Sequence, residues 1–487
     1  MTPRPSPSWP SRRWWTLGVL SAAQLLVALD ATVISIAIPW AERSLTFTHG
    51  DRQWLITSYV LAFGSLLLLG GRLSDLWGRR PTMLLGLAGF AGASALGGWA
   101  HSFSVLVTAR ALQGVFAALI APAALAVLTT TFEDPHERAK SFALYGAVGG
   151  SGAAVGLILG GALTQWATWR WCLYFNVFVA AALVAGVLVC VDPTRGERRT
   201  RLDVTGTVVA SAGLFFVVYG FGHAVAAGWA DERTWGSLVA GVLLLVAFVV
   251  TQRRSSHPLV PLRVILQRTR GGSQVALFVT SLGIFSLSLF LAYYLQNTLD
   301  YSPLRTGVYF LPLVVALGVS TTMASARLLA MVGPRPLVPV GMVLAMLGMI
   351  LFTRLTPQPD YLGSVLPGLV VTGLGLGLIL APATASATAG IARSDAGAVA
   401  ALVNTTQQVG ASVGTALLNT IAVTVTTRYL KAPHTASEWS VLTAATLHGY
   451  AVAFWWAAGF FGVGAVATFV LLESGVPQVE ADLVPML

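Results

Sequence analysis

Apolar runs of about 18 residues or more recur from one end of this 487-residue chain to the other. A helix of about 20 apolar residues is long enough to cross the ~30 Å hydrocarbon layer of a bilayer. Hydrophobic residues make up 55% of the chain and charged residues only 10%, against roughly a quarter charged in a soluble domain. A soluble core could not bury so much apolar surface, so the sequence predicts an all-α integral membrane protein.

The apolar runs fall into groups of six, two and six, and a basic stretch follows each of the first two groups. We expect both basic stretches to be cytoplasmic linkers. The predicted segments are an N-terminus at 1–16, a six-helix bundle at 17–191, a linker at 192–203, two extra helices at 204–252, a linker at 253–271, a second six-helix bundle at 272–472 and a tail at 473–487. These fourteen transmembrane helices are typical of a carrier whose two halves rock around a central site.

The net charge of +10 is distributed unevenly over the predicted loops. Of the 29 lysines and arginines, 20 lie on one set of alternating loops and 8 on the other, which leaves Arg110 inside a span. Excess positive charge marks the cytoplasmic side, so we expect both termini in the cytoplasm and no nucleic-acid groove. The first apolar segment carries Asp30 and is too long for a signal peptide, so we expect it to be retained.

Asp30 is the one carboxylate that we place near the middle of a predicted span. A charge there costs at least ~2.5 kcal/mol, so such a residue is functional by default, and Asp30 and Arg110 are natural partners. Two interpretations of Asp30 stay open: a proton carrier, or a structural ion pair or helix cap. For Arg110, the alternative to pairing is a side chain that extends to the membrane surface and holds headgroups.

The segment Gly71–Arg80 is expected to form a short cytoplasmic loop between the second and third spans. Its carboxylate can accept arginine hydrogen bonds or face a helix N-terminus, which would make a conformational latch that opens as the halves rock. The latch residues are Gly71, Asp75, Gly78, Arg79 and Arg80. Taken alone, the two arginines could equally be topology determinants.

The fifth predicted span is rich in glycine, and Gly152, Gly156 and Gly160 repeat at an interval of four residues, followed by Gly161. Such a face lets two helices approach closely. Static close packing and a sliding contact both require glycine here, so both interpretations stay open.

Two further groups are candidates for a substrate cavity. The first is a polar cluster in the thirteenth span, with Asn404, Gln407 and Gln408, and the second comprises Phe285 and Phe290 in the ninth span. The polar side chains could instead form interhelical hydrogen bonds. For the adjacent Tyr293 and Tyr294 we favour an interfacial aromatic belt over the cavity wall.

The sequence contains no Walker motif, and its two cysteines fall in one predicted span, so neither nucleotide hydrolysis nor a metal cluster is indicated. The absence of a clustered His, Cys or acidic constellation argues against an enzyme. We expect no cofactor and an ion gradient as the source of energy.

These residues resemble motifs of the major facilitator superfamily, and within it the fourteen-span drug:proton antiporters, over essentially the whole chain. The similar segments are Leu29–Thr32 through Pro39, Gly71–Arg80, Arg110–Gly114, Trp169–Trp171 with Asn176, and the glycines of the fifth span. Two positions depart from the family pattern. Ser35 stands where asparagine is usual, and Leu157 occupies the place of a proline.

The resemblance implies a bacterial inner-membrane transporter that exports small amphipathic drugs or an antibiotic in exchange for protons. It implies that Asp30 is the proton or cation site, that Arg110 and Gln113 form the relay, and that Thr32 lines the cavity. We expect a monomer in the lipid bilayer. The alternatives are a carrier of the same fold with another cargo or direction, such as nutrient uptake, and a non-transporting membrane scaffold.

Overall fold

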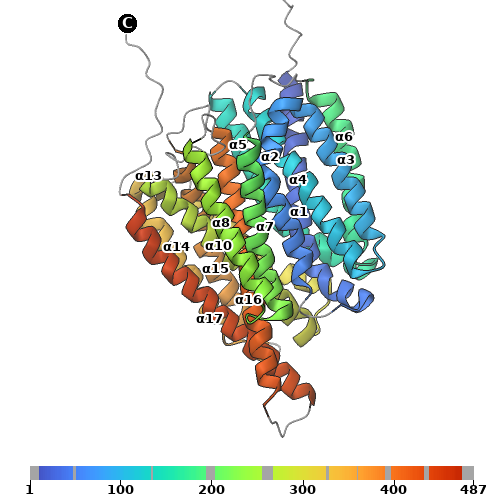
Figure 1. The fold of residues 1–487 in the computed structure, drawn as a ribbon, viewed down its shortest axis with the longest axis vertical. Helices are drawn as coiled ribbons and strands as arrows, with labels where there is room; N and C mark the ends of the chain where they lie inside the picture. Colours follow the sequence, from blue (N-terminus) through green and yellow to red (C-terminus); the bar gives the residue numbers. More distant parts are fainter. Residues whose placement is uncertain are drawn as a thin grey trace, which may run out of the picture.

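The computed structural model describes residues 10–47, 51–132, 135–193, 203–254, 267–324, 328–358, 360–389, 396–432 and 438–473. Every regular element in these residues is a helix, and most helices run roughly along the long axis of the molecule (Figure 1). The chain is therefore an all-helical membrane protein, as the sequence predicts. Helices suit the bilayer interior because each satisfies its own backbone hydrogen bonds.

The first group comprises six helices: α1 (Pro10–Leu45), α2 (Gln53–Trp77), α3 (Arg79–Gly98), α4 (Phe103–Thr131), α5 (Pro135–Trp166) and α6 (Trp171–Cys190). The next two are α7 (Val204–Ala227) and α8 (Glu232–Arg254). The Asp203 side chain caps α7 by accepting a hydrogen bond from the Gly206 backbone amide at 2.8 Å.

The last group begins with α10 (Arg268–Tyr293), which continues as the π-helix η1 (Tyr294–Thr298). The remaining elements are α11 (Pro303–Tyr309), α12 (Leu311–Met323), α13 (Leu329–Val332), α14 (Pro334–Phe352), the π-helix η3 (Tyr361–Val365), α15 (Leu366–Thr388), α16 (Ala396–Leu430) and α17 (Glu438–Leu471). At the start of α11, the Ser302 hydroxyl caps the helix and Pro303 occupies its first turn.

Among the described residues, 12 helices are long and apolar enough to cross a membrane. Two other helices, α2 and α5, contain the shorter apolar segments Trp54–Leu67 and Val155–Trp166. The described part of the chain therefore supplies twelve candidate spans, against the fourteen expected from the sequence. The residues 1–9, 194–202, 255–266 and 474–487, which include most of the two predicted linkers and the tail, lie outside the described residues.

The apolar run Thr306–Leu329, which was expected to form one of the fourteen spans, is not a single helix. It divides into α11 and α12 at Phe310, and residues 325–327 lie outside the described part. Pro312 stands in the first turn of α12, and because proline has no backbone N–H it cannot continue the hydrogen bonding of α11. The apolar pattern alone does not reveal this break, because both halves are equally apolar.

Two sets of helices pack around a shared boundary. In the first, α1 packs on α5, α2 on α4, and α3 on α4 and α6, while in the second α14 packs on α15 and α17, and α10 on α16. Contacts of α2 with α16 and of α5 with α11 join the two sets. In Figure 1, α3 and α6 lie at one side, α14 and α17 at the other, and α7 and α8 between them.

Candidate functional site

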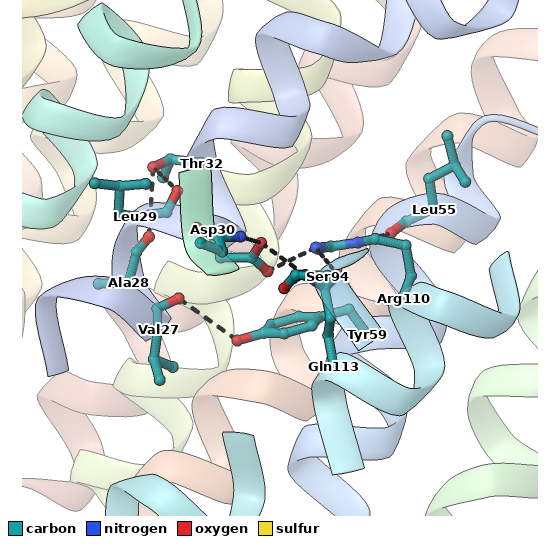
Figure 2. Close-up of polar contacts among 11 residues, drawn as sticks. Val27, Ala28, Leu29, Asp30, Thr32, Leu55, Tyr59, Ser94, Arg110 and Gln113 are labelled. Carbon is teal, nitrogen blue, oxygen red and sulfur yellow. Dashed lines mark hydrogen bonds and ion pairs between the residues drawn. The ribbon is translucent and has the colours of Figure 1, made fainter. Parts of the chain in front are cut away.

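The Asp30 carboxylate lies buried in α1, where it receives hydrogen bonds from three other side chains (Figure 2). Arg110 Nη1 of α4 lies 2.6 Å from Asp30 Oδ2, and Asn176 Nδ2 of α6 donates to Asp30 Oδ1 at 2.6 Å. Gln113 Nε2 donates to the same Oδ1 at 3.2 Å. The structure thus brings Asp30, Arg110 and Gln113 together, from helices 80 residues apart in the sequence.

Arg110 is the central donor of this cluster, and its side chain is 1% exposed. Its Nη1 also donates to Gln113 Oε1 at 2.8 Å, and its Nε donates to the Leu55 carbonyl oxygen at 3.0 Å. The Tyr59 ring lies under the guanidinium, with its centroid 4.5 Å from Arg110 Cζ, which adds a cation–π contact. Arg110 therefore does not extend to the membrane surface.

Sequence reasoning did not assign Ser94, Tyr59 or Asn176 to this site. The Ser94 hydroxyl accepts a hydrogen bond from Gln113 Nε2 at 2.7 Å, and Tyr59 contacts Arg110 as described. Asn176 carried a usable signal, because an amide in the otherwise apolar α6 needs a buried partner. Serine and tyrosine are common in spans, so the sequence offered no comparable signal for the other two.

The geometry limits how the carboxylate can take up a proton. All three donors contact the carboxylate oxygens of Asp30, and breaking a buried ion pair by removing one charge is strongly destabilising. Binding a proton at Asp30 therefore requires Arg110 to move or to find another partner. The arrangement can couple protonation to a rearrangement of α1 against α4.

The Gly71–Arg80 segment, expected in a loop, lies mainly within helices. The helix α2 continues to Trp77 and α3 begins at Arg79, so Gly78 alone separates them, with φ of 96°. The loop prediction was wrong for most of the segment, because its polar residues continue the helical hydrogen bonding beyond the apolar run. Asp75 lies in α2, and its side chain is outside the described part.

The two arginines of this segment tie α3 to its neighbours. Arg79 Nη1 donates to Thr130 Oγ1 of α4 at 2.6 Å, and Arg80 Nη2 donates to the Leu188 carbonyl oxygen of α6 at 2.6 Å. Both contacts lie within the first six helices. In this conformation the arginines hold α3, α4 and α6 together.

The glycines of α5 pack directly against α1. A Cβ atom added at Gly152 would lie 2.7 Å from Ala28 Cβ, one at Gly156 would meet Thr32 Oγ1, and one at Gly160 would lie 2.9 Å from the Val33 carbonyl oxygen. Three successive glycines thus keep α5 in close contact with the helix that carries Asp30. The structure places all three on one face, as the four-residue interval predicts.

Gly161 faces the other set of helices. A Cβ atom there would lie 2.6 Å from the Pro303 carbonyl oxygen of α11. One turn earlier in α5, the backbone carbonyl of Leu157 contacts Gly307 of α11. The residue that replaces the usual proline therefore lies at the contact between the two sets of helices.

The candidate cavity residues do not form one group. Thr32 Oγ1 donates to the Leu29 carbonyl oxygen of its own helix at 3.0 Å and lies at the contact of α1 with α5. Asn404 and Gln407 lie in α16 and are half-buried, and Gln408 of the same helix lies against Gly64 of α2. Gln408 is thus placed at the boundary between the two sets.

The described aromatic residues Phe290, Tyr293 and Tyr294, at the end of α10 and the start of η1, are buried. The Phe290 ring packs among Tyr450 and Phe454 of α17, at centroid distances of 5.3 and 5.9 Å, within the second set of helices. Tyr293 and Tyr294 are buried as well, so the interpretation of a lipid-facing belt was wrong for both. Neighbouring helices cover this end of α10, which the sequence could not show. The side chain of Phe285 lies outside the described part.

Comparison with known proteins places this architecture in a family. Residues 20–415 match the Major Facilitator Superfamily. The chain is 48% identical over 465 residues to a puromycin resistance protein of Streptomyces alboniger, covering 95% of this chain and 92% of that protein. It is 36% identical to a cephamycin export protein of Amycolatopsis lactamdurans, covering 82% of this chain and 83% of that protein.

The fold is similar to that of a solved transporter, a bacterial homologue of the human lysosomal transporter Spinster in an inward-facing, unoccupied conformation. The TM-score is 0.67 at 16% sequence identity, covering 95% of this chain and 98% of that chain. This likeness concerns the fold alone. Together with the sequence match over most of its length, it shows that the chain is a multi-span membrane protein and belongs to the Major Facilitator Superfamily.

Proposed function

We propose that this chain is an efflux transporter that exports a small amphipathic antibiotic or drug in exchange for protons, as a member of the fourteen-span drug:proton antiporters. The proposed direction and cargo rest on the relatives, which are named for puromycin resistance and cephamycin export. The similarity to the first relative covers nearly the whole length of both chains. Puromycin is therefore the first compound to test.

One observation carries the proposed proton coupling. Asp30 and Arg110 form a 2.6 Å ion pair with side-chain exposures of 2% and 1%, in a region where a charge is expensive. An ionisable pair buried inside apolar helices is by default a functional site. We propose that Asp30 binds the proton or a cationic substrate, that Arg110 and Gln113 relay the change, and that the proton gradient supplies the energy.

We propose that α2 and α5 complete a set of fourteen spans. They contain 25 and 32 residues, so at 1.5 Å per residue they are about 38 and 48 Å long, enough to cross ~30 Å of hydrocarbon. The spans divide into bundles at 17–191 and 272–472, with the extra pair at 204–252 between them.

The proposed location is the inner membrane of a bacterium, where the protein works as a monomer with both termini in the cytoplasm. The excess of basic residues on one set of loops supports this orientation. The end of the molecule where α1 finishes and α2 begins is then the outer end. The bundles would rock around the boundary between them, with Arg79 and Arg80 among the contacts that change.

The proposed function can be tested in a bacterial host that lacks its own drug exporters. Cells that express the chain should accumulate less puromycin, and less of the fluorescent cation ethidium if specificity is broad, than cells with an empty vector. A protonophore should abolish the difference, because it removes the proton gradient. Reduced accumulation that persists in the presence of the protonophore would contradict proton coupling. If expressing cells and empty-vector cells accumulate equal amounts of each compound, export of these cargoes is contradicted.

A further inference from the structure

A second buried ion pair lies near the end of α1, far from Asp30. Glu42 Oε2 lies 3.4 Å from Arg52 Nε, and the two side chains are only 12% and 9% exposed. Twelve residues separate Glu42 from Asp30 on α1, which corresponds to about 18 Å along the helix axis. Both residues flank apolar runs of the sequence, but α1 extends to Leu45 and neighbouring helices cover both side chains.

Aromatic residues from the second bundle enclose this pair. Arg52 Cζ lies 3.7 Å from the centroid of the Tyr293 ring at the end of α10, and the Tyr293 hydroxyl donates to Glu42 Oε2 at 3.5 Å. Tyr450 of α17 also faces the Arg52 guanidinium. An ion pair of the first bundle is thus enclosed by two tyrosines of the second, so the two bundles must separate before the Arg52 guanidinium can be fully hydrated.

Other charges near the pair have different environments. Arg43, the next residue of α1, donates to Asn297 Oδ1 at 3.4 Å and lies over the Trp40 ring. Asp51 precedes Arg52 and is half-buried. Among the described residues, the charged and titratable groups with a recorded interaction with Glu42 are Arg52, Tyr293 and Tyr450.

Further contacts join the bundles at the same end. Gln296 Nε2 of η1 donates to the Ile36 carbonyl oxygen at 3.3 Å, and the Leu304 backbone amide of α11 donates to Gln165 Oε1 of α5 at 3.4 Å. With the close approach of α5 and α11, these contacts close this end of the boundary. The pair of Glu42 and Arg52 lies inside the closed region.

We propose that Glu42 is a second proton-binding carboxylate of the transport cycle, and that its ion pair with Arg52 keeps the outer end of the boundary closed until an external proton neutralises it. The identification of this end as the outer one rests on the proposed function. The step forms one O–H bond on Glu42 with a proton from outer water, while Arg52 keeps its own proton. The residual exposure of Glu42 gives that water access.

The physical driving force is the charge that remains. Arginine does not lose its proton in proteins, so neutralising Glu42 leaves the buried Arg52 cation without its carboxylate. The Tyr293 ring and the Tyr450 hydroxyl compensate only part of a full charge. Opening the outer end would return Arg52 to water, so protonation shifts the bundles toward the outward-open state. Asp30, at 2% exposure, is closed to the same water in this conformation.

The test measures opening of the outer end directly and does not depend on knowing the cargo. Spin labels are attached to Ala167→Cys in the first bundle and Leu362→Cys in the second, both at exposed positions of the outer end. The native cysteines are replaced in this background by C172S and C190S. Pulsed electron spin resonance on the full-length protein in lipid nanodiscs, at about pH 5.5 and pH 7.5, then gives the population with a long label–label distance.

In the unsubstituted background, the open population should rise about tenfold between the higher and the lower pH. Glu42→Gln should be open at both pH values, because its side chain is always neutral, whereas Glu42→Asp keeps a titrating carboxylate and should keep the response. Glu232→Gln is the matched control, since it removes an exposed carboxylate at the same end, and it should behave as the background does.

A Glu42→Gln protein that retains the background pH response would overturn the proposal, and so would a background protein whose distances do not change with pH. If the Glu232→Gln protein loses the pH response, the response comes from general surface charge and not from Glu42, which would also overturn the proposal. Failure of the proposed export function would appear in the accumulation assay and would leave this distance measurement readable. The two proposals can therefore fail separately.

Discussion

At the scale of single residues, the buried charges are the most informative feature of this molecule. Asp30 is held by donors from α4 and α6, so three helices depend on one carboxylate. Arg110 in turn contacts α2 through the Leu55 carbonyl oxygen and the Tyr59 ring. A change of charge at Asp30 therefore alters the contacts among α1, α2, α4 and α6.

This network predicts different results for removing one charge and for removing both. Asp30→Asn should abolish proton-driven export, and it should destabilise the protein by about 3–5 kcal/mol because Arg110 stays buried without its counter-ion. The double variant Asp30→Asn/Arg110→Gln should recover most of that stability without recovering export. Thermal unfolding in detergent and puromycin accumulation in cells measure the two effects. A double variant less stable than the single one would contradict the assigned pairing.

At the scale of helices, the contact of α5 with α1 is set by glycine. Gly156 lies so close to Thr32 that an added methyl group would meet both the hydroxyl and the Leu29 carbonyl oxygen, the latter at 3.0 Å. Backbone atoms cannot move aside without moving the helix. The distance between α5 and α1 is thus determined by the missing side chains.

We expect Gly156→Ala to lower stability by about 1–3 kcal/mol and to reduce export, because overpacking would push α1 and Asp30 away from α5. Gly18→Ala is the matched control on α1, since a Cβ atom there meets nothing within 4 Å. An exposed helical glycine replaced by alanine should be neutral or gain about 0.5–1 kcal/mol. Thermal unfolding of both variants checks the prediction. Equal changes in stability for Gly156→Ala and Gly18→Ala would refute it.

The contact that Arg80 makes near the junction of α2 and α3 leads to a prediction about the rate of transport. Arg80 holds α3 to α6 through a hydrogen bond within one bundle, distant from the Asp30 cluster. Arg80→Ala should therefore slow turnover about tenfold or more while leaving the affinity for substrate within about threefold, provided that the contact changes during rocking. Export rates against substrate concentration in proteoliposomes separate the two. Equal losses of rate and affinity would indicate misfolding.

At the scale of the whole molecule, the proposed set of fourteen spans determines on which side each connection lies. If α2 and α5 both cross the membrane, Ala167 in the connection of α5 with α6 lies outside, and Gln267 before α10 lies in the cytoplasm. Single cysteines at Ala167 and Gln267, both exposed, can be labelled with an impermeant maleimide in intact cells in the C172S, C190S background. We expect labelling at the first position only. Labelling at Gln267 but not Ala167 would contradict the proposed count or orientation.

The sequence by itself indicated that this protein lies in a lipid bilayer, and it indicated the family to which the protein belongs. Long apolar runs leave lipid as the only suitable environment, and two opposite charges inside such runs are natural partners. The helical class and the meeting of Asp30 with Arg110 were expected on these grounds, and the transporter family was expected from the resemblance of the Gly71–Arg80 and Arg110–Gly114 segments to known motifs. Glycines at an interval of four likewise identified the close helix contact, because a helix places such residues on one face.

Only the tertiary structure decided which helix faces meet. It placed Asn176 on Asp30, buried Glu42 and Arg52 beneath Tyr293 and Tyr450, and divided one expected span at Phe310. Glu42 and Arg52 read as loop residues because they flank the apolar runs, and their burial comes from α10 and α17, more than 200 residues further along the chain. Local hydropathy records how apolar a segment is, but not which distant helix covers it.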